Sequence, residues 1–194
     1  MINQVLSSVL FVLSISACKK TEDSGLHRNP DGTYSVPNSA LTDEARQLIN
    51  GGFTYQLPVG WSLKTVPGVP YKMAFGRESD GNPANISFQN FAFDGNFARL
   101  QTKILKETSA SLSATGFTDF KVINTSMFET NSKLVGLQTV TQAQRFDGKI
   151  IRQLFYFFER KDGQKIGVVC SVADEGTTYD ERFDAIMKTF RVTK

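Results

Sequence analysis

Five carboxylate residues lie close together in the C-terminal part of the sequence. They are Asp174, Glu175, Asp180, Glu181 and Asp184. Two carboxyl groups at a suitable separation can hydrolyse a glycosidic bond without histidine, one as general acid and the other as base or nucleophile. The same residues surround the predicted start of a helix, where negative side chains cap the first turn and interact favourably with the helix dipole. We therefore expect most of them to stabilise that helix, and a carboxylate-dependent hydrolase remains an alternative.

The other residue types that perform catalysis are scarce. His27 is the only histidine and stands in a polar N-terminal segment, so a Ser-His-Asp or Cys-His unit has no histidine in the rest of the chain. Cys170 alternates within an apolar strand pattern, which predicts a buried, inert thiol. The sequence contains no Cys and His cluster with metal-ligand spacing, and no phosphate-binding or dinucleotide-binding glycine loop. We predict a protein that is not an enzyme, with no catalytic residue, metal or cofactor.

Cys18 stands in a pattern that predicts a covalent modification. An apolar run over residues 5–13 is followed by Ile15, Ser16, Ala17 and Cys18. The run is too short for a helix that spans a bilayer, which takes about 20 residues. The last four residues resemble the lipobox of bacterial lipoproteins, in which the signal peptide is cleaved before the cysteine and lipid is attached to its thiol. Because no Lys or Arg precedes the run, an ordinary cleaved signal or a short uncleaved anchor remains the alternative.

The chain divides into three predicted segments. Residues 1–17 form a lipoprotein signal peptide, residues 18–40 a flexible tether anchored by lipid such as palmitate on Cys18, and residues 41–194 one domain. Lys19 follows the cysteine, where an aspartate would favour retention in the inner membrane of enteric bacteria. We therefore expect a lipid-anchored protein of the bacterial cell envelope, with the outer membrane favoured over the inner membrane.

The composition limits the possible partners. The 194 residues include 22 Lys and Arg against 19 Asp and Glu, and the two signs are interspersed. A formal net charge of +3 without a basic run disfavours nucleic-acid binding. The segment after the tether has about 150 residues, a size that suits one domain with a substantial core. We expect a monomer whose partners are the membrane and an envelope protein.

Hydrophobic periodicity predicts mostly strands after residue 50. Strands are predicted at residues 53–57, 61–66, 71–75, 86–93, 117–128, 134–146, 149–159 and 165–173, and helices at residues 41–49, 97–112 and 178–190. The turn Pro58-Val59-Gly60 predicts that the first two strands form a hairpin, and Asp147-Gly148 and Asp162-Gly163 predict two more hairpin turns.

The strand at residues 150–158 defines the predicted fold class. It is largely apolar on both faces, which is typical of a strand in the middle of a sheet that is covered on both sides. The long helix and the closing helix are the elements available to cover it. Because strands and helices do not alternate in βαβ units, the sheet is not expected to be parallel. We predict an α+β fold, an α/β/α sandwich with a mainly antiparallel sheet covered by helices on both faces.

One stretch of this pattern resembles a known family. Phe53, the run Leu57-Pro58-Val59-Gly60-Trp61, the order of strands and helices, and the terminal helix ending in Phe190 are similar to the PsbP/DcrB-like superfamily, from about residue 50 to the end. The resemblance implies a binding or assembly module, because members have no shared catalytic chemistry, and it assigns no catalytic residue. Trp61 either anchors the turn to the core, which a large aromatic after a Pro/Gly turn favours, or acts as an exposed recognition residue.

Surface turns are the expected partner-binding segments. The candidate residues are Asp80, Asn82, Arg160, Lys161 and Lys165, with Asp147-Gly148 as a further turn. The basic residues near residue 160 could also belong to an ordinary solvated hairpin. We predict a membrane-tethered, non-enzymatic binding or assembly protein of the envelope. An alternative is a carrier of a small apolar ligand, held in a pocket between the sheet and a helix.

Overall fold

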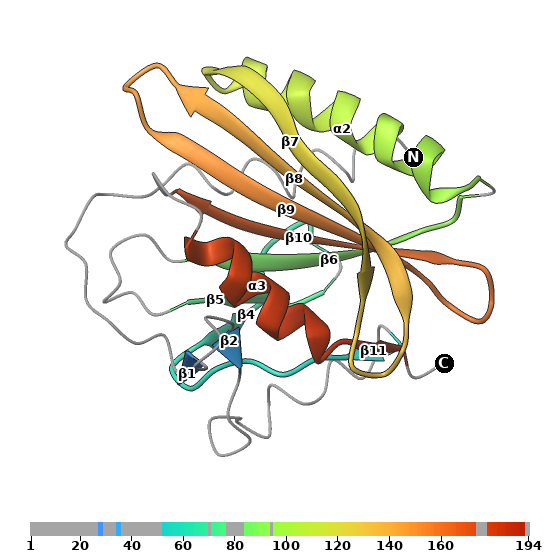
Figure 1. Cartoon of the computed structure of the whole chain (residues 1–194). Helices are drawn as coiled ribbons and strands as arrows, with labels where there is room; N and C mark the ends of the chain where they lie inside the picture. Colours follow the sequence, from blue (N-terminus) through green and yellow to red (C-terminus); the bar gives the residue numbers. More distant parts are fainter. Residues whose placement is uncertain are drawn as a thin grey trace.

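A computed structural model of the chain describes residues 52–69, 71–76, 84–93, 95–173 and 178–192, together with strands β1 (His27–Arg28) and β2 (Tyr34–Ser35) (Figure 1). Several sequence predictions lie outside the described residues. These are the signal peptide at residues 1–17 with Cys18 and Lys19, the helix at residues 41–49, and the residues Asp80, Asn82, Asp174 and Glu175.

A seven-stranded sheet forms the centre of the domain. Its strands, in spatial order, are β4 (Ser62–Lys64), β5 (Met73–Phe75), β6 (Asn85–Phe91), β10 (Lys165–Ala173), β9 (Ile150–Glu159), β8 (Val135–Arg145) and β7 (Phe117–Glu129). Neighbouring strands pair antiparallel throughout this order. The predicted α+β fold with a mainly antiparallel sheet is therefore confirmed.

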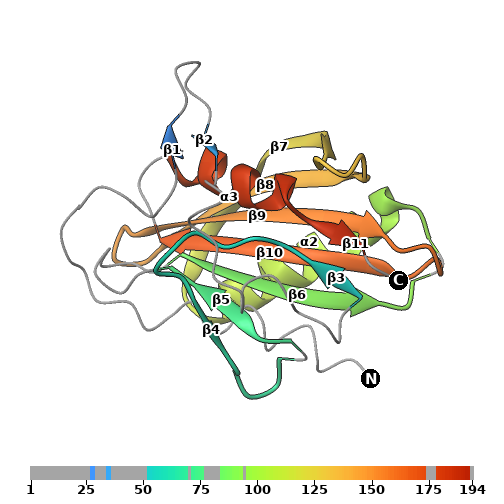
Figure 2. The same ribbon diagram turned by 90° about the horizontal axis from the view of Figure 1, so that it is seen from below.

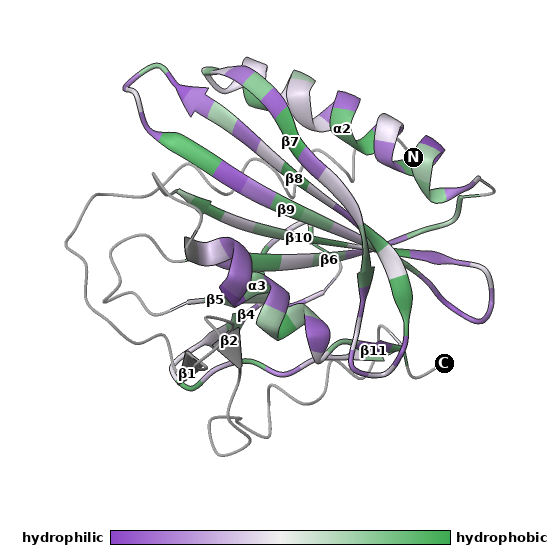
Figure 3. Ribbon diagram, viewed as in Figure 1, coloured by the Kyte–Doolittle hydropathy of each residue, from purple (hydrophilic) through white to green (hydrophobic). Residues whose placement is uncertain are grey.

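Strand β9 explains the long apolar run in the sequence. It lies between β10 and β8, and its residues contribute alternately to two separate apolar clusters. Phe155 and Phe157 belong to one cluster, whereas Tyr156 and Phe158 belong to the other. Successive side chains of a strand point to opposite faces of the sheet, so both faces carry buried aromatic residues. Figure 3 shows hydrophobic residues, coloured green, along the central strands, with hydrophilic residues between some of them.

Helix α2 (Phe97–Ala114) begins and ends at residues that cap it. The Oδ1 atom of Asn96 accepts a hydrogen bond from the amide of Arg99 at 3.0 Å, the usual N-cap contact. Leu100 and Ile104 pack with Phe155 and Phe157, so α2 lies on that face of the sheet. Gly116 follows the helix with a φ of +85°, a conformation that glycine adopts without strain.

Helix α3 (Thr178–Lys188) packs on the Tyr156 face of the sheet, where Phe183, Ile186 and Met187 are fully buried. The predicted helix extends to residue 190, but α3 ends at Lys188. Phe190 is buried just before β11 (Arg191–Val192), which pairs with β3 (Phe53–Thr54).

The predicted hairpin of the first two strands is wrong. The turn itself is present, because the amide of Trp61 donates to the carbonyl of Pro58 at 3.2 Å and Gly60 has a φ of +88°. However, β3 pairs with β11 and β4 pairs with β5. The physical reason is the ring of Phe53, which stacks on Phe88 and Phe190 at centroid distances of 4.8 and 5.4 Å. Chain segment β3 therefore packs on a face of the sheet and does not extend its edge.

The segment predicted as a flexible tether contains a short antiparallel pair. His27 is the Cα partner of Ser35 and Arg28 that of Tyr34. Strand β2 contacts α3, and Figure 2 shows β1 and β2 beside the first turns of that helix. These strands therefore place part of the N-terminal segment next to the domain.

Candidate functional site

Two hairpin turns have the same construction. The first, which we call the Phe146 turn, is Arg145-Phe146-Asp147-Gly148-Lys149, and the second, the Lys161 turn, is Arg160-Lys161-Asp162-Gly163-Gln164. In each turn the first residue donates its amide to the fifth carbonyl, at 2.7 and 2.8 Å, and the glycine donates to the first carbonyl, at 2.9 and 3.0 Å. The glycines have φ values of +82° and +81°, which confirms both Asp-Gly turn predictions.

Side chains complete both turns in the same way. The aspartate pairs with the arginine two residues before it, Asp147 with Arg145 and Asp162 with Arg160. Each aspartate Oδ1 also accepts the amide of the fifth residue, at 3.2 and 3.1 Å. The hydrogen bond from Arg145 is the main reason that the pKa of Asp147 falls to about 2. Both turns are thus held by matching backbone and side-chain contacts.

The antiparallel register places the two turns at opposite ends of the sheet. The Phe146 turn joins β8 to β9 beyond the pair Gln144 and Ile150, whereas the Lys161 turn joins β9 to β10 beyond the pair Glu159 and Lys165. We call these ends the Phe146 end and the Lys161 end. The two predicted hairpin tips therefore lie at opposite ends of the sheet and do not form one surface.

The loop that contains Asp80 and Asn82 starts and finishes at the Phe146 end. Its described boundary is a hydrogen bond of 2.8 Å from the amide of Gly76 to the carbonyl of Ala84, next to the pairing of Phe75 with Asn85. Trp61 packs in the core beside Gly76 and is 8% exposed. The structural interpretation of this tryptophan, as an anchor of the turn, is therefore confirmed.

Arg160 and Lys165 are largely committed to internal contacts. The Nη2 atom of Arg160 lies 3.1 Å from Asp162, and the Nζ atom of Lys165 lies 2.9 Å from Glu159. Lys165 is 6% exposed, and its Nζ atom lies 5.7 Å from the centroid of the Phe97 ring. Lys161 is exposed. Of the three predicted basic residues, Lys161 is therefore the most accessible to a partner.

Phe146 is a surface feature that the sequence analysis missed. Its side chain is 83% exposed, the highest value among the exposed large hydrophobic residues that the structure describes. Its amide donates to the carbonyl of Gly116 at 3.3 Å, and the guanidinium of Arg145 lies 5.7 Å from its ring centroid. The alternating pattern assigns this phenylalanine to the core of a strand, whereas the structure places it on the turn. Its place directly before Asp-Gly is the signal that could have revealed it.

Two carboxylates of the C-terminal cluster, Asp180 and Asp184, connect α3 to the sheet. Asp180 accepts two hydrogen bonds from Arg152, at 2.7 and 2.6 Å. Asp184 accepts hydrogen bonds from the hydroxyl of Tyr156 and the Nε2 atom of Gln138, both at 2.5 Å. Burial raises the pKa of Asp184 because it disfavours the charged carboxylate. These contacts fix the helix on the sheet and account for Asp180 and Asp184 without a reaction.

Cys170 is fully buried in β10 as a free thiol, as the strand pattern predicts. Burial raises its pKa well above the ordinary value, which keeps the thiol protonated and unreactive. Among the residues with a described placement, no three His, Cys, Asp or Glu side chains gather in a way that could hold a metal ion. In the same part of the chain, no helix is long and apolar enough to cross a membrane.

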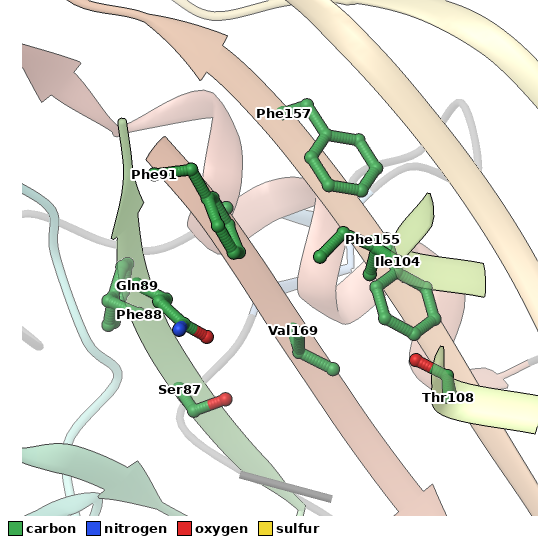
Figure 4. A pocket seen from close by; sticks show the side chains of 10 residues that line it. Ser87, Phe88, Gln89, Phe91, Ile104, Thr108, Phe155, Phe157 and Val169 are labelled. Atoms are coloured by element: carbon green, nitrogen blue, oxygen red, sulfur yellow. The ribbon is translucent and has the colours of Figure 1, made fainter. Parts of the chain in front are cut away.

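A small pocket lies between α2 and the sheet (Figure 4). It is lined mostly by apolar side chains, among them Phe91, Ile104, Phe155 and Phe157. Its volume of about 20 Å³ has room for about one water molecule. Pockets for small ligands are typically about 300 to 1,000 Å³, so this pocket gives no support to the carrier hypothesis in the conformation described.

The sequence matches no family model, and no curated protein is significantly similar to it. Solved structures with a similar fold include the following two. The solution structure of cyanobacterial PsbP (CyanoP) from Synechocystis sp. PCC 6803 superposes with a TM-score of 0.56 and 15% identity, over 91% of this chain and 98% of that chain. The crystal structure of the Ran-binding protein Mog1p from Saccharomyces cerevisiae gives a TM-score of 0.51 and 9% identity, over 76% of this chain and 94% of that chain. The protein has a PsbP-like fold.

Proposed function

We propose that this protein is a non-enzymatic binding or assembly protein of the bacterial cell envelope, held to a membrane by lipid on Cys18. The observation that carries the proposal is the PsbP-like fold, since one protein with a similar fold is described as Ran-binding. The lipobox-like sequence before Cys18 supports the membrane attachment. The outer membrane remains the favoured location because Lys19 follows the cysteine.

The finer architecture in this proposal is a three-layer α/β/α sandwich. Its support is the division of the core, in which Leu100 and Ile104 of α2 pack with Phe155 whereas Phe183 of α3 packs with Tyr156. A domain of this kind holds its surface turns on a rigid sheet, which favours recognition through those turns. The accessible basic residue among the predicted contacts is Lys161, whereas Asp80 and Asn82 lie outside the described residues and remain proposed contacts.

Mass spectrometry of the membrane fraction tests the attachment. We expect an N-terminal peptide that begins at Cys18 and carries acyl chains, and we expect Cys18→Ser to leave the membrane fraction. Three acyl chains would bury enough methylene groups for stable anchoring, whereas one chain binds only marginally. Recovery of Cys18→Ser in the membrane at the level of the unchanged protein would contradict the proposal.

Crosslinking in intact cells tests the binding role. We expect Lys161→Glu to weaken specific crosslinks to an envelope protein without changing the melting temperature, because the side chain is exposed. The matched control is Lys149→Glu, an equal charge change at the opposite end of the sheet. Specific crosslinks that survive both changes would exclude Lys161 as a contact. Turnover of a substrate that is lost in Asp180→Asn or Asp184→Asn proteins that still fold would contradict the non-enzymatic role.

A further inference from the structure

The two matching turns show that Phe146 is not required by the turn that carries it. Lys161 occupies the equivalent position, and the surrounding hydrogen bonds differ by 0.1 Å. A lysine therefore satisfies the same backbone geometry, and at 83% exposure the Phe146 ring contributes little to the core. An exposed aromatic ring on a hydrogen-bonded turn is typical of a contact surface, since the backbone that carries the ring is ordered before binding and less conformational entropy is lost.

A second exposed apolar residue lies at the same end of the sheet. Val59 is 41% exposed on the Pro58-Gly60 turn, and the chain continues into β4, where Ser62 is the partner of Phe75. Phe75 is in turn the partner of Asn85, and Asn85 is the partner of Ser171 in β10, close to the Phe146 end. Strands β4 and β8 are separated by five strand spacings, about 24 Å. Two apolar contacts that far apart fit a broad flat surface better than a single small pocket.

The N-terminal strands lie at this end as well. Strand β10 ends at Ala173 near the Phe146 turn, and α3 begins shortly after it (Figure 2). Strand β2 contacts α3, and β1 is paired with β2 beside the start of that helix. Cys18 precedes β1 by nine residues, which span at most about 30 Å. A lipid on Cys18 therefore limits the distance of β1 from the bilayer to about 30 Å, which favours an orientation with this end of the domain towards the membrane.

We propose that the Phe146 end faces the membrane and that Phe146 and Val59 contact the lipid bilayer. The inference rests on the proposed lipid anchor, which turns a weak surface contact into an intramolecular one with a high effective concentration. Asp147 is paired with Arg145, and Asp119 and Lys121 near the start of β7 have opposite charges. The contact proposed here is made by apolar side chains, so it does not need acidic lipids. The Lys161 end then points away from the membrane, towards protein partners.

Fluorescence quenching by brominated lipids tests the orientation. The mature chain from Cys18 to Lys194 is coupled through the Cys18 thiol to a maleimide lipid in phosphatidylcholine vesicles, while Cys170 is buried and does not react. Single variants Phe146→Trp, Val59→Trp and Lys161→Trp then report three positions, and the signal of buried Trp61 is subtracted with the parent protein. Lys161→Trp is the matched control because it lies in a turn of the same construction.

We expect brominated lipid to quench Phe146→Trp and Val59→Trp and iodide in solution to quench Lys161→Trp. A further change, Phe146→Asp in the Val59→Trp protein, should reduce lipid quenching, whereas Lys161→Asp should not. Equal access of all three positions to iodide, or lipid quenching at the Lys161 turn, would overturn the inference. Quenching of Phe146→Trp that depends on protein concentration and not on brominated lipid would instead indicate contact with a second copy. Because the anchor is supplied chemically, these outcomes are independent of whether Cys18 is acylated in the cell.

Discussion

The Phe146 turn and the Lys161 turn differ at the fifth residue, Lys149 or Gln164, and more strongly at the exposed position between the arginine and the aspartate. Both have an Arg-x-Asp-Gly sequence, an internal ion pair and a glycine with positive φ. At that position one turn exposes a phenylalanine and the other a lysine. Because the two turns have the same backbone geometry, the turn does not require a particular residue at this position, and the side chain there can serve a surface contact. The position between the arginine and the aspartate is free to vary, and its two residue types distinguish the two ends of the domain.

The largest expected effect on stability is the difference between removing a buried phenylalanine ring and removing an exposed one. Phe183 is fully buried on α3, so Phe183→Ala should lower the free energy of unfolding by about 3 to 5 kcal/mol. Phe146→Ala removes the same atoms from an exposed ring and should stay within about 0.5 kcal/mol of the unchanged protein. Urea unfolding of both variants measures the contrast. A loss of several kcal/mol in Phe146→Ala would show that the ring supports the fold after all.

The sequence was sufficient to predict the sheet and both Asp-Gly turns, because these depend on local patterns. Residues 150–158 are apolar on both faces, and β9 lies inside the sheet with buried residues on both sides. Gly148 and Gly163 supply the positive φ that such turns need. Periodicity over about ten residues is enough to specify features of this kind.

Features that depend on contacts between distant residues could not be predicted in the same way. The pairing of β3 with β11 places Phe53 opposite Val192, close to Phe190. No local sequence pattern connects two segments that are so far apart in the chain. Lys165 directly follows a hairpin turn, where a lysine is expected in solvent, but Glu159 and the Phe97 ring contact it and it is buried. The alternating pattern predicts that Phe146 is buried. In the structure its backbone is hydrogen-bonded to Gly116, which has no side chain that could cover the phenylalanine ring.

Two aspartates should give opposite dependences of stability on pH. Asp184 is buried and its pKa is raised, so the folded state binds its proton more tightly than the unfolded state. The free energy of unfolding therefore decreases as the pH rises from the unfolded pKa of about 3.8 through the folded value, and is then constant. The variant Asp184→Asn removes this dependence, and its stability relative to the unchanged protein should increase over that range. Groups near Asp184 that must be unchanged in this comparison are Tyr156, Gln138, Asp180 and Lys188.

Asp147 has the opposite sign because its pKa is lowered to about 2. Its contribution to stability is present above the unfolded pKa and is lost as the pH falls through the folded pKa. Urea unfolding of Asp184→Asn and Asp147→Asn between pH 2 and pH 8 gives the free energy of unfolding of each variant relative to the unchanged protein. The slopes of these two differences against pH should have opposite signs. Slopes of the same sign would contradict the assignment of a pKa raised by burial to Asp184 and a pKa lowered by the Arg145 hydrogen bond to Asp147.

Exchanging the two variable turn residues should have a smaller effect on stability. In the double variant Phe146→Lys with Lys161→Phe, the ion pairs and glycines are kept, so the free energy of unfolding should change by less than about 0.5 kcal/mol. The lipid contact should change much more, and quenching of Val59→Trp by brominated lipid should fall. Unchanged quenching in a folded exchange variant would mean that the identity of the residue at position 146 does not orient the domain.

The smallest expected effect tests whether the two turns are equally rigid. Asp147→Asn and Asp162→Asn each remove an exposed ion pair, and such pairs contribute little to global stability, so each variant should lower the melting temperature only slightly. Locally, the amides of Lys149 and Gln164 lose part of the acceptor that each aspartate provides. Hydrogen exchange at these two amides should therefore accelerate, each in its own variant and not in the other. If only Gln164 responds, other contacts such as the bond from Phe146 to Gly116 hold the Phe146 turn, which would make the aromatic ring still more firmly placed for contact with a surface.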